Sequence, residues 1–242
     1  SEEYKNFCEE RTKKYNELVL GKGIGASIDE DDGFAGVPYE LFIFPGILTM
    51  TVLFQSVFYG LYIVWDRKID FLKEVLAAPL NRSTVFLGKC LGGVTDSMIQ
   101  VTIIIVLGLF IFPEINYTLQ SIMLVYLYLF LLAIIMTSLG LIIGSQMDSP
   151  EGFSLITSLV VFPMYFLSGA LFLKKNLIEE APVIYWLTAI NPASYAVDAI
   201  RYTMIPEDIF LEFGLARDFT VLIGFCIFLL ALGTQCFKTM RL

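Results

Sequence analysis

Asp96 and Gln100 stand in the first half of an apolar run over residues 90–112. A carboxylate inside a membrane-spanning run is costly to bury, and it usually faces the interior of a helix bundle or water. Asp96, with Gln100 one helical turn later, is therefore a candidate for a transport pathway or a gate. The alternative is that Asp96 lies near the lipid headgroups, within two turns of Lys89, where it is solvated or paired.

A second charged pair, Asp198 and Arg201, follows Asn191-Pro192, which begins a predicted helix. The two charges are three residues apart in sequence, so they share one face of that helix. They form either an ordinary interfacial ion pair or part of an external lid over a substrate path. The lid candidates are Asn191, Pro192, Tyr195, Asp198 and Arg201.

The sequence contains no catalytic constellation. It has no histidine, the usual general base and the commonest metal ligand. The four cysteines are scattered, which favours neither a CxxC metal site nor a disulfide framework. Leu87-Gly88-Lys89-Cys90 lacks the upstream glycine and the hydroxyl residue of a phosphate loop, so we expect no ATP site in this chain. We therefore predict a chain without enzymatic activity, metal or cofactor of its own.

The composition is that of an integral membrane protein. The 242 residues are 57% hydrophobic and 17% charged, and the mean hydropathy is +0.73. The net charge of −8 and the lack of a basic patch interleaved with aromatic residues exclude a nucleic-acid partner. Membrane lipid is the expected surrounding.

Five apolar runs predict transmembrane helices and hence an all-α fold, because about 20 apolar residues in a helix cross a bilayer core. We expect Pro45-Gly46 to kink the first run or delay its start, and Pro163 to be tolerated inside the fourth. The GxxxG-type spacing of Gly140 and Gly144 could let helices approach closely. The predicted spans are 41–65, 90–112, 119–144, 153–173 and 219–237.

Three further segments complete the organisation. Residues 1–38 are a polar arm and linker, and a missing span before residue 20 would explain their basic cluster. Residues 39–242 form the membrane domain. Within it, residues 174–218 contain charges and two apolar stretches too short to span, which favours external interfacial or re-entrant helices.

The connector over residues 66–89 is charged and amphipathic. If Arg67–Ala77 is helical, Ile69, Leu72, Val75 and Leu76 form one apolar stripe. The predicted helix therefore lies along the membrane surface or against a soluble partner. Pro79 should end it, and Asn81 or Ser83 should cap the next helix. The charged residues off the stripe are Arg67, Asp70, Lys73 and Glu74.

Lysine and arginine predict the orientation in a cell membrane. With the 66–89 connector and the C-terminus in the cytoplasm, that side holds seven basic residues, Arg67, Lys68, Lys73, Arg82, Lys89, Lys238 and Arg241. The opposite side then has fewer basic residues close to a span, namely Lys22, Lys174, Lys175, Arg201 and Arg217. The positive-inside rule thus favours a cytoplasmic connector and C-terminus.

The order of motifs resembles the permease subunit of type-2 ABC exporters, the daunorubicin-resistance and nodulation-export group. The pattern DRxxxFLKExLxxPxxRxxxxxGK lies between the first two spans, SPEGF precedes the fourth, LSGxLF ends it, and NPxSYxVDxxR lies before the last. The resemblance covers roughly residues 40–242. Asp70 stands where the family commonly has glycine, and the usual first span is not recognisable in residues 1–38.

The resemblance implies a permease that works with a second permease copy and with cytoplasmic ATPase subunits, which carry the ATP and Mg. The 66–89 connector would receive the motion of the ATPase. An ion-coupled secondary transporter and an intramembrane enzyme are the alternatives. The first should show inverted repeats and several ionisable residues at mid-span depth, and the second paired acids or a histidine-based site.

Overall fold

The computed structural model describes residues 39–77, 81–171, 182–205 and 214–239. Its compact unit is Ile43–Leu242. The predicted polar arm, residues 1–38, lies outside the described residues. Every regular element in the described ranges is a helix, as the apolar runs predict. The helices are α3 (Tyr39–Phe58), α4 (Leu61–Lys68), α5 (Phe71–Ala77), α6 (Arg82–Ile111), α7 (Leu119–Gln146), α8 (Pro150–Phe166), α10 (Pro182–Ile190), α11 (Pro192–Met204) and α12 (Leu215–Thr239).

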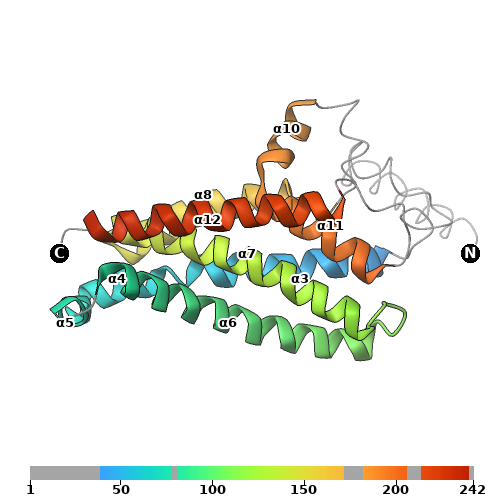
Figure 1. Cartoon of the computed structure of the whole chain (residues 1–242), viewed down its shortest axis with the longest axis horizontal. Helices are drawn as coiled ribbons and strands as arrows, with labels where there is room; N and C mark the ends of the chain where they lie inside the picture. The colour runs from blue at the N-terminus through green and yellow to red at the C-terminus, as the bar shows by residue number, and fades with distance from the viewer. Residues whose placement is uncertain (1–38, 78–80, 172–181, 206–213, 240–242) are drawn as a thin grey trace, which may run out of the picture. The chain divides into compact units, whose positions relative to one another are not determined.

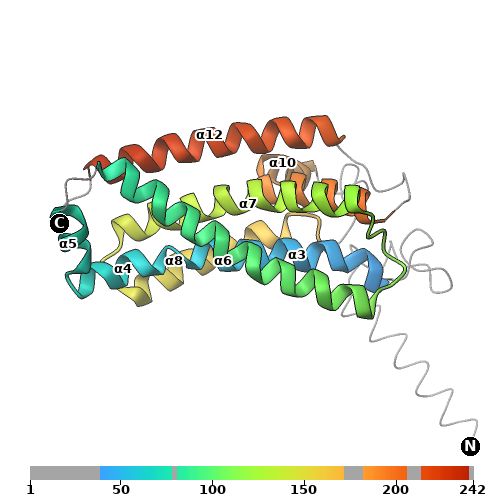
Figure 2. The ribbon, with the colours of Figure 1, turned by 60° about the horizontal axis from the view of Figure 1, so that its bottom comes forward.

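Helix α7 is the central element of the compact unit. It packs against α4, α6, α8, α11 and α12, and Figures 1 and 2 both show α6 and α12 running beside it. Its Leu129, Leu132 and Met136 are fully buried, whereas Phe110 on α6 is 82% exposed. Apolar side chains thus fill the interior and also cover the outside, as expected for helices surrounded by lipid.

The two ends of the bundle differ. Helices α4 and α5 lie at the same end as the last turns of α12, on the left in Figures 1 and 2. There the Arg82 guanidinium donates to the Lys238 carbonyl at 3.3 Å. The turn between α6 and α7 lies at the opposite end, where the Asn116 amide donates to the carbonyl of Met204, the last residue of α11, at 3.0 Å.

Among the described residues, four stretches are long and apolar enough to cross a membrane: Leu41–Lys68, Arg82–Ile111, Leu119–Gln146 and Leu215–Thr239. They match four of the five predicted spans. The remaining one, 153–173, corresponds to α8, which has 17 residues and ends at Phe166. Its predicted end is wrong because a turn follows, with Gly169 at φ 77° and the Ser168 hydroxyl donating to the Tyr165 carbonyl at 2.6 Å.

The first span is interrupted at Tyr59-Gly60, not at its proline. Helix α3 begins before Pro45 and continues through it, so the expected late start is wrong. The break lies on α7, where a Cβ added to Gly140 would come within 2.1 Å of the Val57 carbonyl oxygen, and one at Gly144 within 2.4 Å of the Gly60 oxygen. The GxxxG-type spacing therefore does bring two backbones into contact.

The connector is two helices instead of the one predicted over Arg67–Ala77. Helix α4 extends the first span to Lys68, and α5 begins at Phe71. Between them Asp70 has φ 59°, a left-handed conformation that costs little for glycine and more for other residues. The backbone thus explains why glycine suits this position. Asn81 stands at the N-cap of α6 as predicted, without a side-chain capping bond, and Pro79 lies outside the described residues.

Candidate functional site

The base of the connector is fixed to two spans by adjacent charges, Asp66 and Arg67. Lys89 on α6 donates to the Asp66 carboxylate, and both side chains are about four-fifths shielded from solvent. Arg67 donates to the Ser145 carbonyl at 2.7 Å and the Met147 carbonyl at 3.1 Å, at the C-terminal end of α7. Cations are favourable there because the last carbonyls of a helix carry partial negative charge.

Arg67 also pairs with Asp148 at 3.1 Å, but the Asp148 side chain is 94% exposed. An exposed pair contributes little to stability, so the carbonyl bonds are the stronger part of this contact. We call Asp66, Arg67, Lys89 and the C-terminal end of α7 the connector junction. The sequence places Arg67 on a partner-facing surface, and the structure instead turns it onto α7.

Helix α5 presents the exposed part of the connector. Asp70 and Glu74 are exposed as predicted, and Phe71 is 47% exposed. Of the predicted apolar stripe, Leu72 is fully buried, but Ile69 is 68% exposed because the break at Asp70 takes it out of the helix. The side chains of Lys73 and Leu76 lie outside the described part. The role of α5 in contacting an ATPase stays a prediction.

The lid candidates lie on a buried helix. Asp198 and Arg201 are each only 2% exposed, which does not fit an ordinary solvent-exposed interfacial pair. The Arg201 guanidinium donates to the Gly169 carbonyl at 3.0 Å and the Ala170 carbonyl at 3.1 Å, in the turn that follows α8. Helix α11 also packs on α7 and α12, so it is part of the core.

The start of α11 is fixed to the same turn. The Asn191 side chain accepts from the Ala193 amide at 3.1 Å as an N-cap and donates to the Met164 carbonyl at 2.6 Å. Pro192 occupies the first turn, where its missing amide costs nothing. The Tyr195 hydroxyl donates to the Ala189 carbonyl at 2.6 Å. By contrast, Trp186 on α10 is 67% exposed, so α10 resembles the interfacial helix expected in this segment.

Asp96 meets polar partners from α3. The Gln55 amide donates to Asp96 Oδ2 at 2.6 Å, and one residue further along both helices the Ser56 and Ser97 hydroxyls bond at 2.7 Å. Asp96 is half-buried and lines a groove of about 530 Å³, whereas Gln100 is exposed and does not line it. The structure therefore does not bring Gln100 into this groove.

Sequence reasoning missed Gln55, which donates to Asp96, and Tyr59, which lines the groove with it. Both come from a different span, and their position beside Asp96 depends on how the first span and α6 are aligned, which no spacing within one helix reveals. The available signal was the polar pair Gln55-Ser56 inside an otherwise apolar run.

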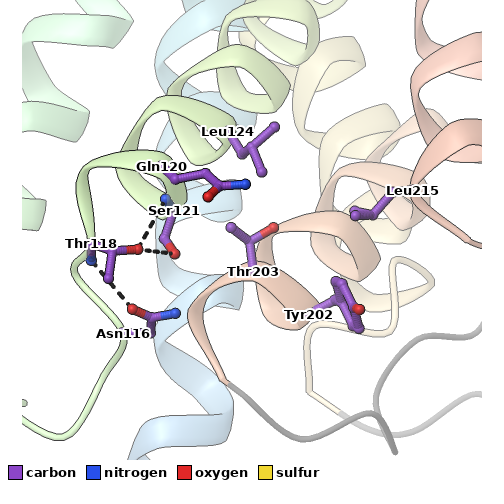
Figure 3. A pocket seen from close by; sticks show the side chains of 8 residues that line it. All are labelled: Asn116, Thr118, Gln120, Ser121, Leu124, Tyr202, Thr203 and Leu215. Carbon is purple, nitrogen blue, oxygen red and sulfur yellow. Dashed lines mark hydrogen bonds between the residues drawn. The ribbon is translucent and has the colours of Figure 1, made fainter.

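A second pocket, of about 430 Å³, lies at the opposite end of the bundle (Figure 3). The Asn116 side chain accepts from the Thr118 amide at 3.3 Å, and Thr118 Oγ1 accepts from the Ser121 amide at 3.3 Å. Burial raises the pKa of the neighbouring Tyr117. Among the described residues the lining is uncharged, so this pocket does not select a ligand by charge. It is lined by Asn116, Thr118, Gln120, Ser121, Leu124, Tyr202, Thr203 and Leu215.

These features define a multi-pass helical membrane protein with a charged connector fixed to its core. The sequence model of the ABC-2 type transporter family matches residues 16–205, and the chain belongs to that family. It is a membrane-spanning permease subunit of an ABC exporter, which confirms the resemblance seen in the motifs. Family membership also implies an ABC ATPase partner in general.

Curated relatives agree with this assignment. The chain is 26% identical over 216 residues to the inner membrane transport permease YadH of Escherichia coli K12, covering 87% of this chain and 78% of the relative. It is 30% identical over 171 residues to the putative transport permease ycf38 of Cyanophora paradoxa, covering 68% and 56%. It is 25% identical over 201 residues to nodulation protein J of Neorhizobium galegae, covering 81% and 73%.

Proposed function

We propose that the permease receives the motion of its ATPase on α5 and passes it through the connector junction to α6 and α7. The observation that carries this proposal is the double attachment of α4. Asp66 is bonded to Lys89 on α6, and Arg67 is bonded to the end of α7. A displacement of α5 must therefore either move both spans or break these contacts.

The exposed residues of α5 suit a soluble partner. Glu74 provides a charge that needs water or a complementary surface, and the exposed Phe71 on the same helix provides apolar contact area. Leu72, fully buried, holds α5 to the rest of the bundle. A helix with one buried anchor and an exposed mixed face can accept a partner without unfolding.

The proposed orientation places α4, α5 and the end of α12 in the cytoplasm. The helix ends that meet here carry basic residues, in agreement with the positive-inside rule. Lys68 ends α4, Arg82 and Lys89 lie in the first turns of α6, and Lys238 lies in the last turn of α12. Helix α10, with its exposed aromatic and aliphatic side chains, then lies on the external side. We place the protein in the cell membrane, in contact with lipid.

The full exporter would contain two permease copies, this chain with itself or with a related permease, and two ATPase subunits that hold the ATP and Mg. The chain itself would bind neither, because its sequence has no phosphate loop. Export of a drug, lipid, glycolipid or polysaccharide would follow from motion of the spans. Helix α11 would act as a rigid part of the external closure, held to the turn after α8 by Arg201 and Asn191.

Cross-linking tests this proposal. In a chain whose native cysteines are replaced by alanine, Glu74→Cys on α5 should cross-link to the co-expressed ATPase through a short bifunctional thiol-amine reagent. Glu114→Cys, in the exposed turn at the opposite end of the bundle, is the matched control and should not react with it. Cross-linking from Glu114→Cys, or none from Glu74→Cys in an intact complex, would overturn both the orientation and the docking site.

A further inference from the structure

We propose that the groove beside Asp96 binds an organic cation that carries an apolar tail. The groove runs between the α3–α4 break and α6, and it shares Tyr59 and Tyr62 with a second hollow of about 250 Å³ that reaches Trp65. That such a cation is the exported compound rests on the proposed permease function. Binding in the groove is a property of the chain alone. The groove is lined by Tyr59, Tyr62, Gly92, Thr95, Asp96 and Ile99.

The charge at the groove comes from Asp96. Gln55 holds one carboxylate oxygen at 2.6 Å, but an amide is neutral and leaves the negative charge in place. In the described ranges no lysine or arginine pairs with Asp96, and the nearby Lys89 is bonded to Asp66 instead. A carboxylate at membrane depth is stabilised by a counter-charge, so a cationic ligand is the complementary occupant.

Aromatic rings form the wall above this carboxylate. Tyr59 and Tyr62 meet edge to face, with their ring centroids 5.0 Å apart. The Tyr59 hydroxyl lies against Gly92, where an added Cβ would come within 2.5 Å of its oxygen, so the missing side chain makes room for the ring on α6. Aromatic faces attract ammonium groups, and two rings beside a carboxylate favour a cation over a neutral polar group.

The groove opens toward side chains that face lipid. Ile99 in its lining is 57% exposed, Leu91 on the same helix is 60% exposed, and Tyr62 is 56% exposed. A ligand with its charged head at Asp96 can therefore keep an alkyl or aromatic tail against the exposed apolar face of α6. This geometry selects an amphiphile that enters from the bilayer.

Fluorescence of Trp65 tests the proposal without the ATPase. The chain contains two tryptophans, and Trp186 is exposed on α10, so a Trp186→Phe background leaves Trp65 as the reporter beside the groove. The probe is a hexadecyl quaternary ammonium with a nitroxide in its headgroup, and its matched control is the neutral hexadecanoyl ester of the same nitroxide. Both are titrated into the purified chain in dodecyl maltoside micelles, which contain no amine.

We expect saturable quenching by the cation, with half-saturation about tenfold below that of the neutral probe. Asp96→Asn keeps the shape and the bond from Gln55, and it should abolish the difference between the probes. Tyr62→Leu should weaken only the cationic probe, by about fivefold. Glu114→Gln removes the same charge at the other end of the bundle and should leave the preference unchanged.

Three results would overturn the proposal. They are equal binding of the two probes by the parent chain, a preference for the cation that survives Asp96→Asn, and a preference for the cation that Glu114→Gln abolishes as fully as Asp96→Asn does.

Adding phosphatidylethanolamine or phosphatidylglycerol to the micelles then distinguishes a resident lipid from a free cationic compound as the natural ligand. Competition by the amine lipid alone identifies a resident lipid, and no competition identifies a free cationic compound. If the probe fails to bind while Glu74→Cys still cross-links to the ATPase, the permease role stands and only the ligand class is lost.

Discussion

Helices α5 and α11 look alike in sequence but lie in opposite environments. Each is short and amphipathic, and each carries charged residues. Yet α5 exposes Phe71 and Glu74, whereas the charged Asp198 and Arg201 of α11 are almost completely buried. Amphipathic spacing therefore shows which residues share a face, but not whether that face meets water.

The difference comes from the backbone that each helix meets. Helix α8 ends at Phe166, and the turn after it leaves carbonyls without helical partners, so Arg201 can be buried while donating to Gly169 and Ala170. Helix α5 follows a left-handed residue, Asp70, which separates it from α4 and the first span. The buried Arg201 thus fixes α11 to the turn after α8, whereas Glu74 of α5 is exposed at the surface, where a partner can reach it.

Arg201→Ala should have the largest effect on stability. It leaves two buried carbonyls without their donor, so the free energy of unfolding should fall by about 3 kcal/mol. Unfolding in mixed detergent and sodium dodecyl sulfate micelles, followed by circular dichroism, measures this loss. Arg217→Ala, at an exposed position in the first turn of α12, is the control and should change the free energy by less than about 0.5 kcal/mol.

The double change Asp198→Ala/Arg201→Ala sharpens this prediction. If Asp198 depends on the charge of Arg201, the double variant should lose less stability and less transport than Arg201→Ala alone. Losses that simply add would show that the two buried charges act independently.

Gly140→Ala should be the next most damaging change, because Gly140 is where α7 contacts the backbone of the first span, just before α4. The new Cβ would lie 2.1 Å from the Val57 carbonyl oxygen, so α3 and α7 would have to separate. We expect a loss of about 2 kcal/mol in the same unfolding assay. Gly224→Ala on α12, where an added Cβ meets nothing within 4 Å, should cause no loss. Equal losses in the two variants would contradict a specific contact at Gly140.

The sequence predicts the features that depend on local pattern, but not those that depend on contacts between helices. The apolar runs predict the helical fold and four of the spans, because hydropathy and length act locally. Asn191-Pro192 predicts the start of α11 for the same reason. The burial of Arg201, the inward turn of Arg67 and the contact of Gln55 with Asp96 depend on which helices become neighbours. A single sequence does not contain that alignment.

Arg67→Ala should have a moderate effect on stability and a larger one on coupling. It removes bonds to the Ser145 and Met147 carbonyls from a side chain that is partly exposed, so a loss of about 1 kcal/mol is expected. ATPase activity of the reconstituted complex should persist while substrate export falls. Asp148→Asn is the control, since this side chain is 94% exposed and should be nearly neutral. Export that survives Arg67→Ala would show that α7 does not need this contact.

Glu74→Lys should change stability least, by less than about 0.5 kcal/mol, because the side chain is exposed and outside the core. Its effect should appear only with the partner, since a reversed charge replaces an attraction or a hydrogen bond by repulsion. The variant should insert correctly and reach the membrane, yet co-purify less ATPase and export less substrate. Glu114→Lys, exposed at the opposite end, carries the same charge reversal and should behave as the parent.

If the Glu74→Lys variant exports fully and its association with the ATPase is unchanged, this residue has no part in the mechanism. If Lys73→Glu also has no effect, α5 only anchors the chain at the membrane surface, and the force must reach α6 and α7 by another contact.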